Sequence, residues 1–312
     1  MVDLHDDAAE PLESPNPARG RASQTDPLAP GLYIVATPIG NLEDITLRAL
    51  RILRDVDRIA CEDTRQSRKL LTHFGISTPT VSCHAHNENQ RSAELVAELA
   101  RGARIALISD AGMPGISDPG ALLVAQAIAA GVQVIPVPGA SAAVSALAAS
   151  GLETNRFLFV GFLPPRSGER RSALEDLKHA RATLICYEAP HRILETLRDA
   201  SQTLGGARRA VLAREITKLH EEFLRGTIAE LERTLSGRGL PRGEMTLLIA
   251  AESSAEKETA QAASPASLRE QMAVYMGAGL DEQSALKRVA RDRGVSKSAV
   301  YREWQREQGR SG

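Results

Sequence analysis

Residues 109–120 (SDAGMPGISDPG) carry three glycines, two prolines and two aspartates in one short stretch. The stretch follows the apolar run 105–108, which is typical of a buried strand, and precedes residues 121–125, which resemble the start of a helix. Open α/β sheets place their ligands at the carboxyl ends of strands, so we expect this loop to build a binding site. Asp110 and Asp118 make the loop acidic, which argues against a phosphate cradle and favours a cationic or hydroxyl-rich ligand.

Four further segments place small, polar or prolyl residues at the ends of apolar runs. They are residues 37–42 (TPIGNL), 136–142 (PVPGASA), 187–192 (YEAPHR) and 243–246 (GEMT). We expect these loops to come from two α/β domains and to converge on a cleft between them. The sequence has neither G-x-G-x-x-G after a strand nor G-x-x-x-x-G-K-[ST], which disfavours a nicotinamide enzyme and a P-loop ATPase.

Apolar strands alternate with amphipathic helices in the first half of the chain, as in a parallel α/β domain. Glycines follow several helical runs at the positions where C-terminal caps are expected, namely Gly75, Gly102, Gly131 and Gly151. We expect strands at 31–36, 58–61, 80–83, 103–108 and 132–137, and helices at 46–56, 64–74, 87–101, 119–130 and 140–150.

A second α/β unit follows, with more closely spaced strands that favour a mixed sheet. We expect strands at 156–162, 183–187, 210–214, 222–225 and 245–250, and helices at 170–179, 191–202 and 228–235. The predicted organisation is a disordered extension 1–30, a first domain 31–152, a second domain 153–252, a polar linker 253–266 and a helical module 267–312.

Composition is that of a globular protein, with 43% hydrophobic and 25% charged residues in 312. No apolar run is long enough for a membrane span and no signal peptide is recognisable, so we expect a cytoplasmic protein with no membrane partner. Cys61, Cys83 and Cys186 are too few and too far apart for a disulfide framework or a metal knuckle, and we expect no metal. Residues 265–312 hold nine basic and six acidic residues, which suggests contact with an anionic polymer.

The order of several motifs resembles the tetrapyrrole-methylase superfamily, and within it the branch that methylates small-subunit ribosomal RNA. The motifs are VATPIGNLEDIT, CEDTR, SDAGMPGISDPG, PVPGASA, YEAPHR, REITKLHEE and GEMTLLI, spread over residues 31–252. The resemblance implies two αβα domains with S-adenosylmethionine bound between them, in a homodimer. It also implies a decoding-centre cytidine of 16S RNA as the 2′-O acceptor, presented as naked RNA or as the assembled 30S subunit.

The resemblance also implies which residues bind the donor. They are Pro38 after the first strand; Asp110, Ala111, Gly112, Ile116 and Ser117 in the acidic loop; Ala140 and Ser141 on the adenosine side; and Met245 and Thr246 beside the adenine. A donor sulfonium becomes neutral as its methyl leaves, so a tight acidic cage would slow transfer. One or two carboxylates near the ribose or amino-acid moiety are therefore expected.

Methyl transfer to a hydroxyl requires in-line orientation and loss of the hydroxyl proton. The candidate bases are Glu62 and Asp63 in CEDTR, and Glu188 and His191 in YEAPHR. Each acid has a structural alternative, because Asp63 can cap the helix opening at residue 64 and Glu188 can pair with the arginine four residues later.

Basic residues in three segments are candidates for RNA contact, and a solvated surface is the alternative for each. They are Arg65 and Arg68 after CEDT; Arg166, Arg170 and Arg171 in a mobile loop, PPRSGERR, beside the cleft; and Lys297 and Arg302 in the tail.

The tail has the spacing of a helix-turn-helix, with helices at 281–293 and 297–305, and Ala290, Gly294 and Val300 at the packing, turn and anchor positions. A helical hairpin that packs on the body or on a dimer partner is the alternative. Two other functions stay open: a small-molecule, tetrapyrrole-like methylase of the same fold, and a DNA-binding regulator acting through residues 281–305.

Overall fold

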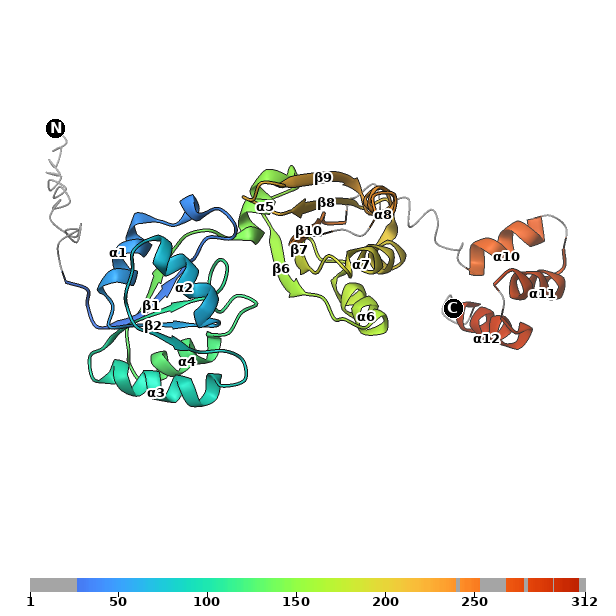
Figure 1. The fold of residues 1–312 in the computed structure, drawn as a ribbon. Helices are drawn as coiled ribbons and strands as arrows, with labels where there is room; N and C mark the ends of the chain where they lie inside the picture. The colour runs from blue at the N-terminus through green and yellow to red at the C-terminus, as the bar shows by residue number, and fades with distance from the viewer. Residues whose placement is uncertain (1–26, 240–241, 253–267, 278–279, 294, 309–312) are drawn as a thin grey trace, which may run out of the picture.

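The structure is a computed structural model that describes residues 27–239, 242–252, 268–277, 280–293 and 295–308 (Figure 1). The predicted linker 253–266, most of the predicted extension 1–30 and the predicted turn residue Gly294 lie outside these residues. The two sheets and the C-terminal helices confirm the predicted α/β class.

The first sheet is wholly parallel and has the strand order β3-β2-β4-β1-β5. Its strands are β1 (Gly31–Val35), β2 (Arg58–Cys61), β3 (Thr80–Ser82), β4 (Arg104–Ile108) and β5 (Val134–Val137). The helices that alternate with them are α1 (Leu47–Asp55), α2 (Thr64–His73), α3 (Glu88–Ala100) and α4 (Ala121–Ala129). Alternate strand residues enter two apolar clusters, because a parallel sheet buries both faces.

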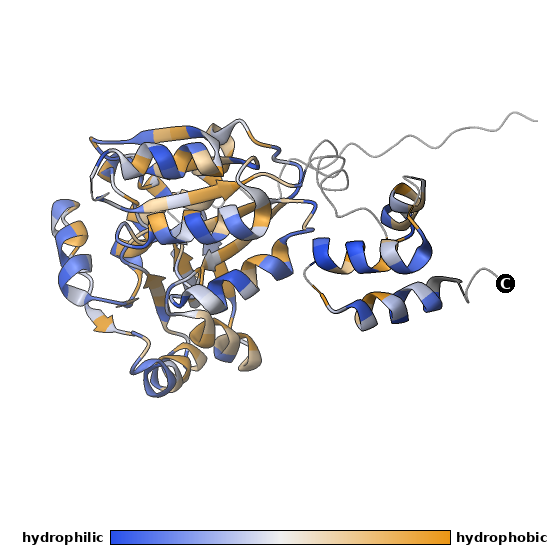
Figure 2. Cartoon of the chain, turned by 90° about the vertical axis from the view of Figure 1, so that its right-hand side faces the viewer, coloured by the Kyte–Doolittle hydropathy of each residue, from blue (hydrophilic) through white to orange (hydrophobic). Residues whose placement is uncertain are grey.

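The second sheet is mixed, as predicted, with the order β6-β7-β10-β8-β9 and a single parallel pair, β6 with β7. Its strands are β6 (Phe157–Phe162), β7 (Thr183–Glu188), β8 (Arg209–Arg214), β9 (Glu222–Thr227) and β10 (Met245–Ile249). Helices α6 (Ser167–Leu177), α7 (Ile193–Ala200) and α8 (Ile228–Ser236) cover one of its faces. The strands are largely orange in Figure 2, whereas the helices around them carry both blue and orange, as helices with one buried face do.

Helix α5 (Ala142–Ser150) follows β5 of the first sheet but packs on the second (Figure 1). Its small apolar face, with Ala143, Ala146 and Leu147, joins the cluster on the face opposite α6–α8. Arg225 of β9 donates to the carbonyls of the last turn of α5, at 2.7 and 3.3 Å. By packing, α5 belongs with the second sheet, although the sequence pattern groups it with the first domain.

In the part of the tail that the structure describes, three helices surround an apolar cluster of their own, namely α10 (Leu268–Gly277), α11 (Glu282–Asp292) and α12 (Lys297–Gln308). The two helices predicted at 281–293 and 297–305 are confirmed, and Ala290 and Val300 are buried as expected of their positions. The Trp304 indole donates to Glu282 at 3.2 Å and holds α12 to α11. No helix among the described residues is long and apolar enough to cross a membrane.

A candidate active site between the two sheets

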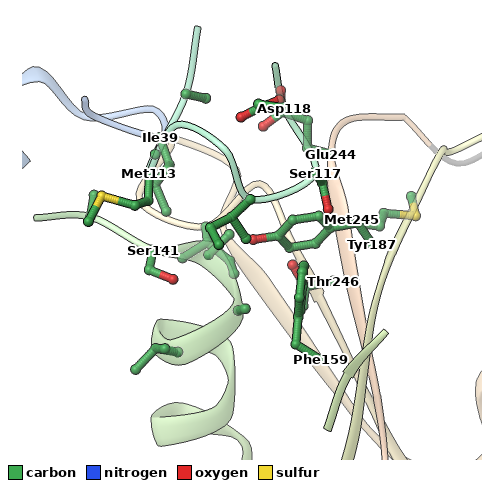
Figure 3. Close-up of a pocket in the computed structure, with 18 of the residues that line it drawn as sticks. Ile39, Met113, Ser117, Asp118, Ser141, Phe159, Tyr187, Glu244, Met245 and Thr246 are labelled. Carbon is green, nitrogen blue, oxygen red and sulfur yellow. The ribbon is translucent and has the colours of Figure 1, made fainter. Parts of the chain in front are cut away.

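A cavity of about 720 Å³ opens between the two sheets, within the range of about 300–1,000 Å³ typical of small-molecule sites (Figure 3). One wall comes from the first unit, namely the loops after β1, β4 and β5. The other wall comes from β6, the end of β7 and the start of β10. The lining is mostly apolar, with a few polar side chains such as Ser117, Asp118 and Ser141.

A two-hydrogen-bond bridge joins the loops after β1 and β4. The Thr37 amide donates to the Gly112 carbonyl at 2.9 Å and the Gly112 amide returns a bond to the Thr37 carbonyl at 3.1 Å. The Thr37 hydroxyl also donates to the Ser109 carbonyl at 3.0 Å. Gly112 has φ +79, and a Cβ there would lie 3.3 Å from Cγ2 of Ile39, so backbone geometry and space both favour glycine.

The N-terminus of α4 is occupied by a side chain of the protein. Oε1 of Glu88 accepts from the amides of Gly120 and Leu122, at 2.8 and 3.2 Å. A helix N-terminus otherwise attracts phosphate, and here a carboxylate already meets it. This contact accounts structurally for the predicted absence of a phosphate cradle in the loop 109–120.

The two walls touch at several points. The Asn41 amide donates to the Thr217 hydroxyl at 3.1 Å, from the loop after β1 to the loop after β8. Gly161 of β6 approaches the acidic loop so closely that a Cβ on it would lie 3.2 Å from Oγ of Ser117. These contacts fix the width of the cleft from both sides.

The structure brings eight of the ten predicted donor residues into the lining of this one cleft. They are Ala111, Gly112, Ile116, Ser117, Ala140, Ser141, Met245 and Thr246. Pro38 and Asp110 lie beside the lining instead. The Asp110 carboxylate lies near enough to Asp63 for the Asp63 backbone to lower its pKa, against the larger effect of burial.

Carboxylates gather at the carboxyl edge of the first sheet. Burial raises the pKa of Asp118, which lines the cleft, and the charge of Asp110 adds to the shift. Burial also raises the pKa of Asp110, and the charge of Asp63 adds to that shift. Glu62 has its pKa raised first by burial and then by the charges of Asp118 and Asp110. The edge is thus short of positive partners and suits a ligand that brings a cationic group.

The structure separates the four candidate bases. Asp63 caps α2, accepting from the Arg65 amide at 2.8 Å. Both oxygens of Glu188 are engaged: Oε1 by the next amide and Arg192, and Oε2 by the Thr196 hydroxyl at 2.6 Å. The structural alternatives for these two acids are therefore present. His191 is exposed and Glu62 is half-buried, and both lie outside the cleft lining. The charge of Asp118, which does line the cleft, acts on Glu62 and helps to raise its pKa.

The prediction that Arg170 contacts RNA is wrong for this structure. The segment 167–177 is helix α6 and not a loop, and Arg170 is fully buried. Its guanidinium pairs with Asp199 of α7 at 2.6 Å, which draws the side chain inward. The other predicted RNA contacts are exposed on the surface, at Arg65, Arg68, Arg166, Arg171, Lys297 and Arg302.

Sequence reasoning missed the aromatic side of the cleft. Phe157, Phe159 and Phe162 of β6 and Tyr187 of β7 all line it. Tyr187 lies in the middle of the pocket, near Phe159 and with Ser117 close by (Figure 3). The available signal was three phenylalanines within six residues, in a chain that has only five.

Comparisons with known proteins agree with this geometry. The sequence profile of the Tetrapyrrole (Corrin/Porphyrin) Methylases matches residues 31–232. A Halalkalibacterium halodurans protein named ribosomal RNA small subunit methyltransferase I is 50% identical, over 86% of this chain and 93% of that protein. A Pseudomonas aeruginosa protein of the same name is 46% identical, over 90% and 98%.

Among solved structures, a diphthine synthase shares the fold with a TM-score of 0.58 at 16% identity, over 71% of this chain and 90% of that one. The match to the methylase profile covers both sheets up to α8, and the relatives extend over the remaining part of the cleft. The chain therefore belongs to the tetrapyrrole methylase family and, within it, to the group of ribosomal RNA small subunit methyltransferase I.

Proposed function

We propose that this chain transfers a methyl group from S-adenosylmethionine to the ribose 2′-hydroxyl of a cytidine in small-subunit ribosomal RNA. S-adenosylmethionine is the methyl donor of the family. The observation that carries the proposal is the convergence of eight expected donor residues, from loops far apart in sequence, on one cleft of suitable volume. The names of the relatives support ribosomal RNA as the acceptor.

The residues present fit such a donor. The Ala111–Gly112 turn and the segment around Ser141 carry little side chain and let a ligand approach the backbone closely. Met245 and Thr246 offer a mostly buried surface for a flat adenine ring. The donor supplies a methyl group on a cationic sulfur. Three carboxylates lie in the lining, and those of Glu188 and Glu244 are paired with Arg192 and Lys218. Asp118 therefore attracts that charge without the site surrounding it with free acids.

The chain's own contribution to catalysis is orientation and proton removal. The Thr37–Gly112 bridge stiffens one wall and the Asn41–Thr217 contact joins it to the other, so the cleft would align the acceptor oxygen with the methyl group. Glu62 is our candidate base, because its raised pKa brings it closer to the working pH. Asp63 and Glu188 have their carboxylates engaged in capping and pairing.

We further propose that the acceptor RNA, free or in the 30S subunit, crosses the exposed arginines of α2, those at the start of α6 and two basic residues of α12. Arg65, Arg68, Arg166 and Arg171 are exposed on the body, and Lys297 and Arg302 on the tail. Their charges suit phosphate, which contributes affinity and little sequence choice. A homodimer, which the family resemblance implies, would present two such surfaces.

The test uses small subunits from cells that lack this modification, incubated with the full chain and S-adenosylmethionine labelled with tritium in its methyl group. We expect label in the RNA, released by nuclease digestion as 2′-O-methylcytidine. Subunits from wild-type cells, whose RNA already carries the methyl group, are the control and should take up little label. Label in a base, or in no nucleoside at all, would refute the proposal.

The same assay tests one alternative, because a small-molecule methylase would label an added tetrapyrrole and leave the subunits unlabelled. A DNA-binding measurement tests the other, because a regulator would show sequence-specific duplex binding that depends on α12. The ribosomal RNA names of relatives at 44–52% identity favour the RNA acceptor over both.

A further inference from the structure

Two aromatic side chains at the edge of the cleft are unusually exposed to solvent. Phe157 and Phe162 both line the cleft, yet they are 48% and 56% exposed. They lie on β6, which is an edge strand of the second sheet. Exposed aromatic rings that line a cavity are typical of a surface that receives a ligand.

A β-bulge turns Phe162 toward the cleft. Phe157 and Phe159 pair with residues 183 and 185 of β7, and the register then shifts between Phe159 and Gly161. Phe162 consequently pairs with Tyr187, which shares a face with residues 183 and 185. In a regular strand Phe162 would lie on the opposite face, because side chains alternate. The extra residue aligns three phenylalanines on one side, as bulges beside functional sites often do.

The bulge depends on Gly161 and holds the aromatic row against the acidic loop. Gly161 has φ +72, which other residues rarely adopt. A Cβ at this position would also come within 3.2 Å of the Ser117 hydroxyl. Phe162 is therefore fixed beside the loop that we assign to the methyl donor.

The four rings divide into an inner and an outer pair. Phe159 and Tyr187 meet edge to face, with centroids 5.0 Å apart at 71°, and both pack against the α5 cluster. Phe162 contacts the Tyr187 ring with its centroid 5.7 Å away, at 61°. Phe162 and Phe157 are the exposed members of the set. The inner pair supports the wall, and the outer pair offers free π surface.

We propose that Phe162, assisted by Phe157, stacks against an unpaired nucleobase of the RNA substrate at or next to the acceptor ribose. The proposal rests on the proposed function and adds the place where the acceptor strand is held. Enzymes that do chemistry on a nucleobase receive it outside its helix and stack it between aromatic or apolar side chains, and a ribose acceptor presented in the same way would bring its base to such a wall. Aromatic side chains bind single-stranded bases through their planar faces, with little dependence on sequence.

A nucleobase could come from either of two sources, the RNA or the adenine of the donor. The exposure of Phe157 and Phe162 favours the RNA, because the donor residues Met245 and Thr246 are 4% and 3% exposed and lie deeper. If an RNA base stacks on Phe162, removing the ring should lower kcat/KM toward small subunits and leave the donor Kd unchanged. If the donor adenine stacks there, the donor Kd should rise as well.

The experiment compares Phe162→Ala with wild type for kcat/KM toward small subunits and for the Kd of S-adenosylmethionine. We expect kcat/KM to fall about 5- to 100-fold, the effect of losing one base stack, and the donor Kd to stay within about twofold. Phe162→Trp should retain most of the activity because it keeps a planar ring, whereas Phe162→Leu should not. Leu158→Ala is the matched control, since Leu158 is 41% exposed on the same strand and does not line the cleft.

Three results would overturn the inference. One is a Phe162→Ala protein as active as Leu158→Ala, and another is full activity in Phe162→Leu. The third is a donor Kd that rises in parallel with the loss of kcat/KM, which would assign the ring to the donor adenine. Thermal unfolding of each variant separates loss of fold from loss of stacking. A wild-type protein that methylates no small subunit would instead refute the proposed function itself.

Discussion

Replacing Gly112 with alanine tests whether the turn after β4 binds the methyl donor. Gly112 has φ +79, pairs with Thr37 through two hydrogen bonds and lines the cleft. A Cβ at this position would lie 3.3 Å from Ile39, itself part of the lining. The substitution therefore strains the backbone at the place where we expect the donor, and it leaves every polar side chain in place.

The expected size of the effect follows from the backbone conformation. A non-glycine residue in the left-handed region costs roughly 1–2 kcal/mol. If the loop relaxes into other conformations to remove this strain, the binding-competent state is disfavoured by about 5- to 30-fold, and the apparent donor Kd rises by the same factor. The part of the strain that the loop retains appears in addition as a decrease in Tm, of at most about 2–8 °C.

Gly131→Ala is the matched control. Gly131 has φ +72, has no atom within 4 Å of an added Cβ and does not line the cleft. Both variants should lose stability for the same backbone reason, but only Gly112→Ala should bind S-adenosylmethionine more weakly in calorimetric titration. Equal donor affinity in the two variants, with equal loss of Tm, would refute the assignment of this turn to the donor.

Three further predictions concern charge. Burial raises the pKa of Asp118, so its ionisation destabilises the fold as the pH rises above about 4; Asp118→Asn should raise Tm at pH 7, and thermal scans should show the gain vanish below pH 4. Asp199→Ala leaves the buried Arg170 without its closest partner, and urea unfolding should show a loss of about 3–5 kcal/mol; a loss under 1 kcal/mol would contradict this. Reversing the charges of Lys297 and Arg302 on α12 should weaken binding to small subunits and flatten its salt dependence, with donor Kd unchanged; an unchanged salt slope would exclude the tail from the RNA contact.

Much of the fold is predictable because its signals are local. The strand at 58–61 is observed with the predicted bounds, and the glycines after helical runs have positive φ as capping requires, Gly75 and Gly102 among them. The first strand of the second unit and the start of β10 likewise fall within one residue of expectation. Apolar periodicity and helix-capping residues are patterns among neighbouring residues, so a single sequence is enough to show them.

The missed features depend on partners that are distant in the sequence. Arg170 reads as a surface arginine until Asp199, 29 residues later, is placed beside it. Helix α5 follows the first sheet along the chain, and nothing local shows that its small residues pack on the second sheet. The bulge that turns Phe162 into the cleft is likewise a property of the pairing with β7.

For the site, the motif resemblance predicted donor residues in several separate loops, and the structure brings most of these residues into one cleft. Local spacing indicated Asp63 as a helix cap and Glu188 as a partner of Arg192, and both contacts are present. The Thr196 hydroxyl, which engages the second oxygen of Glu188, was not foreseen. The aromatic wall was missed because its rings come from two strands and one irregular register.

The central claim is that the cleft between the two sheets is the donor site. The most direct measurement is a crystal structure of the full chain with S-adenosylhomocysteine, the demethylated product of the donor. We predict density for it in the cleft, with its adenosine toward Met245 and Thr246 and its sulfur on the side of the Ala111–Gly112 turn. Product bound at another surface, with this cleft empty at saturating concentration, would contradict the account.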